Sequence, residues 1–224
     1  NGQPEFPDSS NRSLYGRPTT VDGMITLGYD GKVAVITGAG GGLGRQHALL
    51  LASRGALIVV NDLGGAVDGG GADASAAQKV VDEIRAAGGE AVANHDSVST
   101  PEGGESIIKT AIDAYGRVDI VINNAGISLS SPAGSSHDDF LSAWDTTLAI
   151  NLSAYVHLVR AALPHLKLSS SGRIVNVAST ESIVATPTLS AYSASKSGGE
   201  KLLEKGSALS LSNKGALAVT PDVP

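Results

Sequence analysis

The 224-residue chain contains no cysteine, a single methionine and a single tryptophan. Without cysteine it has no disulfide bridge, no thiolate nucleophile and no cysteine-ligated metal or iron–sulfur site. Long apolar stretches are also missing, because the longest runs, such as Ala56–Val60, have only the length of a strand. We therefore predict no membrane-spanning helix.

Several patterns that would indicate other function classes are absent as well. The net charge of −6 argues against a broad surface for nucleic acid. The G-x-S-x-G motif of serine hydrolases does not occur, and the five histidines show no metal-binding spacing. No charged-then-apolar leader opens the chain. We expect a soluble intracellular protein, cytoplasmic or peroxisomal, with no metal, membrane or nucleic-acid partner.

Glycine, in contrast, is abundant, with 28 residues. This excess indicates loops in which the backbone approaches a ligand or another backbone segment closely. The first 30 residues differ from the rest, because Pro4, Pro7 and Pro18 lie among polar residues without apolar periodicity. We interpret residues 1–30 as an extended or disordered N-terminal arm and residues 31–224 as one folded domain that carries all candidate site residues.

From Gly31 onward, short β-branched runs alternate with helical patterns. The predicted strands are Lys32–Thr37, Ala56–Val60, Glu90–Asn94, Val118–Ile122, Arg173–Val177 and Ala216–Val219. The predicted helices are Leu43–Arg54, Ala74–Ala87, Glu102–Tyr115, Phe140–Leu166 and Ala191–Leu211, with Pro164 ending or kinking the fourth. This alternation predicts an α/β fold with a single doubly wound parallel sheet, a Rossmann fold, short at its C-terminus.

The stretch Thr147–Leu166 is apolar almost all round its helix. A helix on one face of a sheet needs only one apolar stripe. The second apolar face indicates either a helix from a partner subunit, giving a homodimer or homotetramer, or deep burial within a monomer. The residues leave both interpretations open.

The segment Thr37–Gly44 (TGAGGGLG) lies between the first predicted strand and helix. Glycines there let the backbone turn sharply and approach a pyrophosphate, and the following helix N-terminus offers free N–H groups. The segment is not a P-loop, because Arg45 and Gln46 occupy the positions that Lys and Ser/Thr would need. The pattern predicts a dinucleotide site.

Asp62 follows the second predicted strand. A carboxylate there can accept hydrogen bonds from both hydroxyls of an adenosine ribose and repels a 2′-phosphate. The next residue is Leu63, so no arginine is at hand to bind a phosphate. The position favours NAD over NADP, and an Asx turn is the alternative structural interpretation.

Tyr192 and Lys196 are four residues apart in the last predicted helix, so the phenol and the ammonium lie on one face. A nearby cation lowers the pKa of a tyrosine, which suits a general acid–base for hydroxyl–carbonyl interconversion. Alone, such a pair is typical of a solvated helix face. Ser179, however, follows the fifth predicted strand, and ligands bind beyond the carboxyl ends of parallel strands. Gly38, Asp62 and the segment after the fourth strand lie at such ends too.

Together these patterns resemble the short-chain dehydrogenase/reductase family over residues 31–219. The features that carry the resemblance are TGxxxGxG at Thr37–Gly44, NNAG at Asn123–Gly126, Asn151, Ser179 and YxxxK at Tyr192–Lys196. The resemblance implies an NAD-dependent oxidoreductase that interconverts a secondary alcohol and a ketone by hydride transfer, acting as a homo-oligomer on a small-molecule substrate.

The resemblance also implies roles for individual residues. Tyr192 would give or take the proton, and Lys196 would lower its pKa and hold the nicotinamide ribose. Ser179 would bind the substrate oxygen, and Asn151 would place a water in a proton relay. The implied cofactor contacts are Gly38, Gly42, Leu43, Gly44, Asp62, Asp96, Ser97, Asn123, Ala125, Gly126, Tyr192 and Lys196.

Within the family, Val60–Gly65 and Ala91–Val98 resemble the dehydrogenase region of peroxisomal multifunctional enzymes, which oxidises (3R)-hydroxyacyl-CoA with NAD. The likeness lies in the cofactor half, so steroid, sugar and small-alcohol substrates stay open. After Val219 the chain lacks the Pro-Gly turn, substrate loop and further strand usual in the family. Two alternatives therefore remain: an NADP-dependent ketoreductase, and a catalytically impaired NAD-binding protein.

Overall fold

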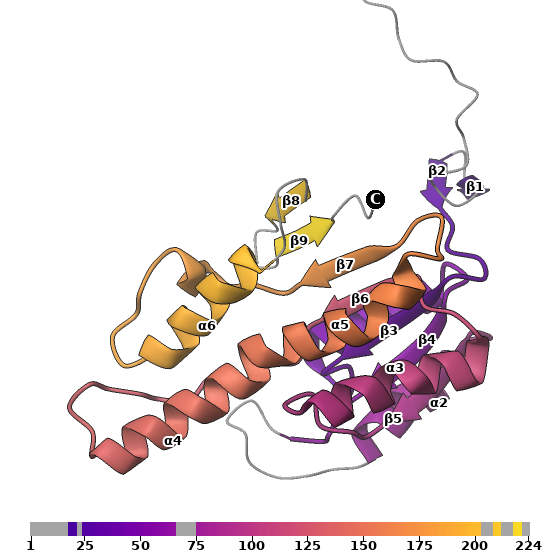
Figure 1. Ribbon diagram of the computed structural model, residues 1–224. Helices are drawn as coiled ribbons and strands as arrows, with labels where there is room; N and C mark the ends of the chain where they lie inside the picture. The colour runs from indigo at the N-terminus through magenta and orange to yellow at the C-terminus, as the bar shows by residue number, and fades with distance from the viewer. Residues whose placement is uncertain (1–17, 22–23, 66–74, 203–207, 212–216, 221–224) are drawn as a thin grey trace, which may run out of the picture.

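A five-stranded parallel sheet forms the centre of the molecule, with strand order β5-β4-β3-β6-β7 (Figure 1). The computed structural model describes residues 18–21, 24–65, 75–202, 208–211 and 217–220. The strands of this sheet are Val33–Thr37 (β3), Leu57–Asn61 (β4), Glu90–Asn94 (β5), Ile120–Asn123 (β6) and Arg173–Asn176 (β7). The predicted doubly wound parallel sheet is confirmed.

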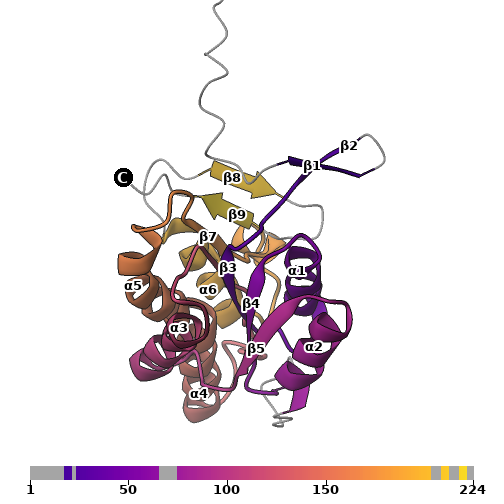
Figure 2. The same ribbon diagram turned by 90° about the vertical axis from the view of Figure 1, so that its right-hand side faces the viewer.

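Helices cover both faces of the sheet (Figure 2). One face carries α1 (Gly42–Ala52) and α2 (Ser75–Ala86), and the other carries α3 (Pro101–Tyr115) and α5 (Ala154–Leu166). Strand β3 is buried at all its positions, and its alternate residues serve two separate cores. Ala34 and Ile36 pack in the core beneath α1 and α2, whereas Val33 and Val35 pack in the core beneath α3 and α5. This two-sided burial explains why the strands read as unbroken apolar runs.

The long helical stretch predicted for Phe140–Leu166 consists of three joined pieces. Helix α4 spans His137–Leu148, a π-helical turn η1 spans Ala149–Ser153, and α5 continues to Leu166. The stretch begins earlier than predicted because the Ser136 hydroxyl accepts a hydrogen bond from the backbone N–H of Asp139 (3.2 Å) and caps the helix. Pro164 lies in the last turn, as expected, and the helix ends two residues later.

Two predictions at the C-terminal end are confirmed only in part, because the helix ends early and the last strand pairs differently. The predicted helix Ala191–Leu211 is shorter: α6 spans Ser190–Lys201, and Ala208–Leu211 form strand β8. The sequence of this segment, ALSL, does not itself indicate a strand, which forms through its pairing with β9. The predicted sixth parallel strand is β9 (Leu217–Thr220), which pairs antiparallel with β8 in a separate two-stranded sheet. Only residues 212–216 separate them, too short a connection for a parallel crossover.

At the N-terminal side, β1 (Pro18–Val21) and β2 (Met24–Leu27) pair as an antiparallel hairpin. Within the predicted arm, residues 1–30, residues 1–17 and 22–23 lie outside the described residues. Just after the hairpin, Tyr29 packs against the core beneath α1 and α2, and its N–H donates to the Arg54 carbonyl (2.7 Å). None of the described helices is long and apolar enough to cross a membrane.

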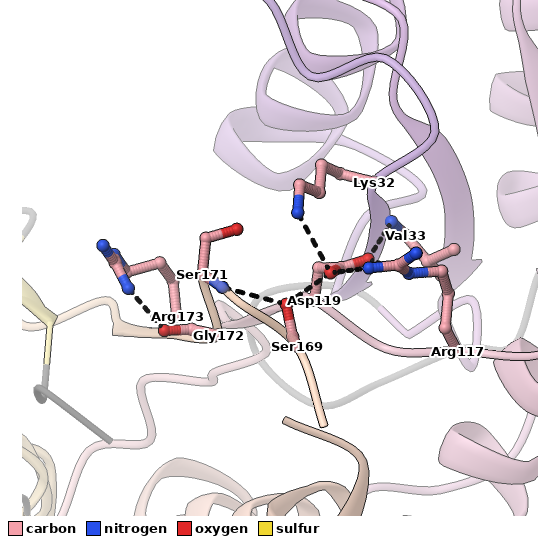
Figure 3. A network of polar contacts seen from close by, with 8 residues as sticks. All are labelled: Lys32, Val33, Arg117, Asp119, Ser169, Ser171, Gly172 and Arg173. Carbon is pink, nitrogen blue, oxygen red and sulfur yellow. Dashed lines mark hydrogen bonds and ion pairs between the residues drawn. The ribbon is translucent and has the colours of Figure 1, made fainter. Parts of the chain in front are cut away.

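A buried carboxylate ties the strands together at their amino ends (Figure 3). Asp119, whose side chain is fully buried, accepts hydrogen bonds from the backbone N–H of Val33 (3.0 Å), the guanidinium of Arg117 (2.7 and 2.8 Å) and the hydroxyl of Ser169. Lys32 adds an ion pair at 3.5 Å. Burial alone would raise the pKa of Asp119, but the hydrogen bonds from Arg117, Ser169 and Val33 hold it below its ordinary value. This network belongs to the architecture, because the site residues lie at the opposite edge.

Candidate active site

The carboxyl edge of the parallel sheet is marked by a row of buried polar side chains. Each of the five strands ends in threonine or asparagine: Thr37, Asn61, Asn94, Asn123 and Asn176. Side-chain amides pair across neighbouring strands, from Asn61 Nδ2 to Asn94 Oδ1 (2.7 Å) and from Asn123 Nδ2 to Asn176 Oδ1 (2.8 Å). The row gives the loops beyond it fixed points of attachment.

The glycine-rich loop is attached to the segment that follows β6. Thr37 Oγ1 accepts hydrogen bonds from the N–H groups of Asn124 and Ala125 (both 3.1 Å), and Asn124 Nδ2 donates to the Thr37 and Gly38 carbonyls. Gly38 has a φ of +62°, and a Cβ there would lie 2.8 Å from Ala125 Cα. The contact lies between β3 and β6, where the strand order reverses and ligands bind in open α/β sheets.

The N-terminus of α1 has the properties of an anion site. A Cβ at Gly44 would collide with the Gly38 carbonyl, whereas one at Gly41 or Gly42 would meet nothing within 4 Å. No side chain caps this helix, its first turn holds no acidic residue, and Leu43 is 44% exposed. Uncapped N–H groups and the positive helix end fit a pyrophosphate, so these residues suit a dinucleotide.

Asp62 lies directly after β4, with its carboxylate fixed beside this loop. Oδ2 accepts a hydrogen bond from the N–H of Gly40 and Oδ1 accepts one from the N–H of Gly64, both at 2.7 Å. The side chain is half-buried and Leu63 beside it is 55% exposed. The second bond is the predicted Asx turn, so the structural interpretation of Asp62 is correct and is compatible with ribose binding, because carboxylate oxygens have further acceptor capacity.

Asp96 and Ser97 follow β5 at the same edge. The Asp96 carboxylate accepts hydrogen bonds from Ser106 Oγ (2.6 Å) and Asn94 Nδ2 (2.8 Å), and these bonds hold the pKa of Asp96 below its ordinary value. Its carbonyl accepts a hydrogen bond from Asn61 Nδ2 (2.9 Å). Ser97 Oγ lies 2.9 Å from the hydroxyl of Ser99. The Asp96 side chain is therefore bonded to α3, and its backbone carbonyl is bonded to the end of β4.

The side chains of Asn123 and Asn151 are both buried. The Nδ2 group of Asn123 donates to Asn176, whereas its Oδ1 has no hydrogen-bond partner. Asn151, in the π-helical turn, donates from Nδ2 to the Ile127 carbonyl and accepts from the Ile127 N–H at Oδ1, both at 2.8 Å. Asn151 Nδ2 also contacts Ser195 Oγ (3.2 Å). The amide thus holds the segment after Gly126, and π turns are frequent at functional sites.

Tyr192 and Lys196 lie on one face of α6, as predicted. Lys196 Nζ is 5.7 Å from the centroid of the Tyr192 ring and donates to the carbonyl of Val177 (3.0 Å). The lysine is only 4% exposed, and burial lowers its pKa to about 8, whereas Tyr192 is half-buried. A Cβ at Gly126 would lie 3.3 Å from both Lys196 Nζ and Asn151 Oδ1. The structure thus brings Lys196 together with three other predicted site residues, namely Tyr192, Gly126 and Asn151.

Ser179 begins the short helix η2 (Thr180–Ser182), where its hydroxyl accepts from the Glu181 N–H (3.3 Å). Glu181 was not predicted from the sequence. Its carboxylate accepts hydrogen bonds from the N–H and hydroxyl of Thr186 (2.9 and 2.6 Å) and from Ser193 Oγ (3.1 Å). The Thr186 hydroxyl and N–H keep the pKa of Glu181 below its ordinary value. Glu181 therefore ties the loop after Ser179 to the residue beside Tyr192.

Tyr155 was also missed by the sequence analysis. It is 2% exposed, and its hydroxyl donates to the Val177 carbonyl (2.9 Å). The signal available in the sequence was its spacing, because Tyr155 follows Asn151 by four residues and shares its helix face. No group of three or more potential metal ligands occurs among the residues that the structure describes.

Comparison with known proteins is consistent with this arrangement. The family model for short chain dehydrogenases matches residues 32–216. Over 171 residues (76% of this chain) the sequence is 48% identical to a short-chain type dehydrogenase/reductase of Mycobacterium tuberculosis, and over 172 residues (77%) it is 47% identical to the peroxisomal multifunctional enzyme type 2 of Mus musculus. The matched parts are 59% and 23% of those proteins' own lengths.

Among solved structures, a short chain dehydrogenase/reductase from Burkholderia phymatum in complex with NAD matches with a TM-score of 0.69 and 33% identity. The match covers 79% of this chain and 59% of that one. Fold, motif positions and sequence identity therefore agree. The chain belongs to the short-chain dehydrogenase family, whose members are oxidoreductases acting on CH–OH groups.

Proposed function

We propose that this chain binds NAD and interconverts a secondary alcohol and a ketone by hydride transfer. The observation that carries the proposal is the pairing of Tyr192 with the buried Lys196 at the sheet edge that also bears the open N-terminus of α1. A pure NAD-binding protein has no need for a buried ammonium beside a half-buried phenol. That argument disfavours the catalytically impaired alternative.

The residues present fit a dinucleotide along this edge. The uncapped turn at Gly42, Leu43 and Gly44 would hold the pyrophosphate. Gly38 allows the loop to pack closely on Ala125, and Asp96 with Ser97 would border the adenine. Ala125 and Gly126 would border the nicotinamide half, and Asn123, which is bonded to Asn176 at the end of β7, precedes that loop. Bound NAD would supply the hydride acceptor at its nicotinamide.

Asp62 supports NAD rather than NADP as the cofactor. Its carboxylate is held by the N–H groups of Gly40 and Gly64, so it cannot easily turn away from the ribose position. A 2′-phosphate would face this negative charge, and the neighbouring Leu63 offers no compensating cation. A measured preference for NADPH over NADH would contradict this electrostatic argument and would favour the second candidate, an NADP-dependent ketoreductase.

The chain's own residues would carry the proton. Tyr192 would take the proton from the substrate hydroxyl during oxidation and return it during reduction. Lys196 would stabilise the phenolate and hold the ribose, and Ser179 would donate a hydrogen bond to the substrate oxygen as charge develops on it. Asn151 keeps the Gly126–Ile127 segment in place and would orient a water in the relay from Lys196.

For the substrate we propose a 3-hydroxyacyl-CoA as the first class to test, because the peroxisomal multifunctional enzyme is 47% identical over the matched region. Cellular location in the peroxisome and assembly into a homodimer or homotetramer are part of the same proposal. Steroids and small alcohols form the comparison panel.

Titration with NADH and, separately, NADPH tests the proposal, with the nicotinamide emission as the signal. We expect tight binding of NADH and weak binding of NADPH, and a loss of this difference in Asp62→Ala. Tyr192→Phe should abolish turnover of the oxidised substrate while NADH affinity stays within a few fold. Failure to bind either cofactor would contradict the cofactor assignment, and full turnover by Tyr192→Phe would contradict the proton step.

A further inference from the structure

We propose that Tyr155 is a positioning residue for Lys196: its buried hydroxyl and the carbonyl of Val177 together hold the ammonium beside the ring of Tyr192. The catalytic importance of Lys196 in this inference rests on the proposed function, whereas the contacts around Lys196 are independent of it. Tyr155 comes from α5, Val177 follows β7, and the other two residues lie on α6. Three separate parts of the fold therefore meet at one nitrogen.

Hydrogen bonds define this meeting point. Val177 O accepts from Tyr155 Oη at 2.9 Å and from Lys196 Nζ at 3.0 Å. Lys196 Nζ also donates to Tyr155 Oη at 3.4 Å. The phenol thus acts as donor to the carbonyl and as acceptor for the ammonium, which uses both functions of a hydroxyl. The Tyr155 hydroxyl, the Val177 carbonyl and the Lys196 ammonium are therefore each hydrogen-bonded to the other two, away from solvent.

Close packing between helices brings Tyr155 within reach. A Cβ at Gly199 would lie 2.9 Å from the Tyr155 ring, and one at Gly198 would lie 2.9 Å from the Leu152 side chain. The two glycines therefore let α6 approach the π-helical turn and α5 more closely than alanines would. Because Lys196 is less than one turn before Gly199, the ring of Tyr155 fixes the distance of the lysine from α5 as well as its hydrogen bonding.

The chemistry requires such a partner. An ammonium removed from water is unfavourable unless acceptors replace the lost solvent. Among the described residues, the titratable side chains in contact with Lys196 include Tyr155 from α5 and Tyr192 from its own helix, with ring centroids at 6.0 and 5.7 Å from Nζ. Val177 contributes a carbonyl from the end of β7, and Gly126 contributes only backbone. Removing the Tyr155 hydroxyl leaves one acceptor and disfavours the charged form.

The test replaces Tyr155 by phenylalanine in the full 224-residue chain, which keeps the ring against Gly199 and removes only the hydroxyl. Tyr115→Phe is the matched control, because Tyr115 on α3 packs against the core beneath α3 and α5, and no hydrogen bond or ring contact joins it to Lys196. The primary readout is the pKa of Lys196, followed by NMR of 13Cε-labelled lysine and assigned with Lys196→Arg. We expect Tyr155→Phe to lower this pKa by about one pH unit and Tyr115→Phe to leave it unchanged.

The same variants should separate positioning from general packing in kinetics. In Tyr155→Phe, the alkaline limb of the kcat/KM profile should move to lower pH together with the Lys196 pKa, since the cation is lost earlier. An unchanged Lys196 pKa in a folded Tyr155→Phe variant would overturn the proposal. If the wild-type chain binds no NADH, the proposed function fails, while the NMR titration still decides the positioning role.

A measurement on the unsubstituted sequence covers the case in which Tyr155→Phe does not fold. In chain labelled with 13Cζ-tyrosine, the Tyr155 signal should shift with a midpoint equal to the pKa of Lys196, because the two groups share a hydrogen bond. A Tyr155 signal that does not change while Lys196 titrates would overturn the proposal. A shared midpoint supports it.

Discussion

Replacing Lys196 by methionine tests the electrostatics of the site through the stability of the fold. Lys196 is 4% exposed, and burial lowers its pKa from 10.5 to about 8. Below pH 8 the lysine is charged in both the folded and the unfolded chain, so the folded chain carries the full cost of the buried charge. Between pH 8 and 10.5 only the unfolded chain keeps the proton, and the free energy of unfolding therefore rises with pH.

The size of this effect follows from the two pKa values. At about 1.4 kcal/mol for each pH unit, their difference corresponds to ~3 kcal/mol, of which about 2 kcal/mol falls between about pH 7 and pH 9.5. The upper limit is set below the ordinary pKa of tyrosine, about 10. Burial raises the pKa of Tyr155 further, so this phenol stays protonated over the range.

Urea unfolding followed by circular dichroism at the two pH values measures the effect. The wild-type chain and Lys109→Met, which removes an exposed lysine bonded to Asp113 on its own helix, should both gain ~2 kcal/mol relative to Lys196→Met as the pH rises. Parallel pH dependence of the wild type and Lys196→Met would refute the reasoning, because it would mean that Lys196 has the same pKa in both states of the chain.

Three further predictions concern other parts of the molecule. Gly44→Ala should lower the free energy of unfolding by more than about 1 kcal/mol, while Gly41→Ala, which meets open space, should change it by less than about 0.5 kcal/mol; equal losses in urea would contradict the packing. Asp119→Asn should cost about 2–3 kcal/mol at neutral pH, and since the pKa of this buried carboxyl is lowered, the difference should shrink as the pH falls below about 4; a constant difference would count against it. Glu181→Gln should lower kcat and leave NADH affinity unchanged, because it loosens only the loop between the substrate serine and the tyrosine; a weakened NADH affinity in fluorescence titration would argue otherwise.

Much of the fold could be predicted because the central strands β3, β4 and β6 are buried on both faces. Their apolar runs then stand out from the flanking glycines, as in Val33–Thr37. Prediction failed where pairing depends on partners rather than on local pattern. Residues 208–211 have the composition of a helix end, and only their pairing with β9 in the folded chain makes them a strand. For β9, the sequence predicted the strand but not its antiparallel pairing with β8.

For the site, local motifs located the residues but not their bonds. The four-residue spacing placed Tyr192 and Lys196 on one face. It could not reveal that Lys196 is buried against Val177, because that contact joins α6 to the end of β7. Tyr155 was missed for the same reason, since a tyrosine in an apolar helix resembles any core aromatic until the carbonyl it bonds is known.

The π-helical turn at Ala149–Ser153 also sets the rotational phase of the long helix. Before and through it, buried residues recur every fourth position, at Ala143, Thr147, Asn151 and Tyr155. An α-helix has 3.6 residues per turn, so each such step would carry the stripe round by about 40°. The π-helical turn has more residues per turn than an α-helix, so it offsets this rotation and keeps the buried stripe on one side. Deleting one residue within Ala149–Ser153 would rotate all later side chains by about 100° relative to α4, turning the tyrosine hydroxyl and the leucines of α5 away from the surfaces they now meet.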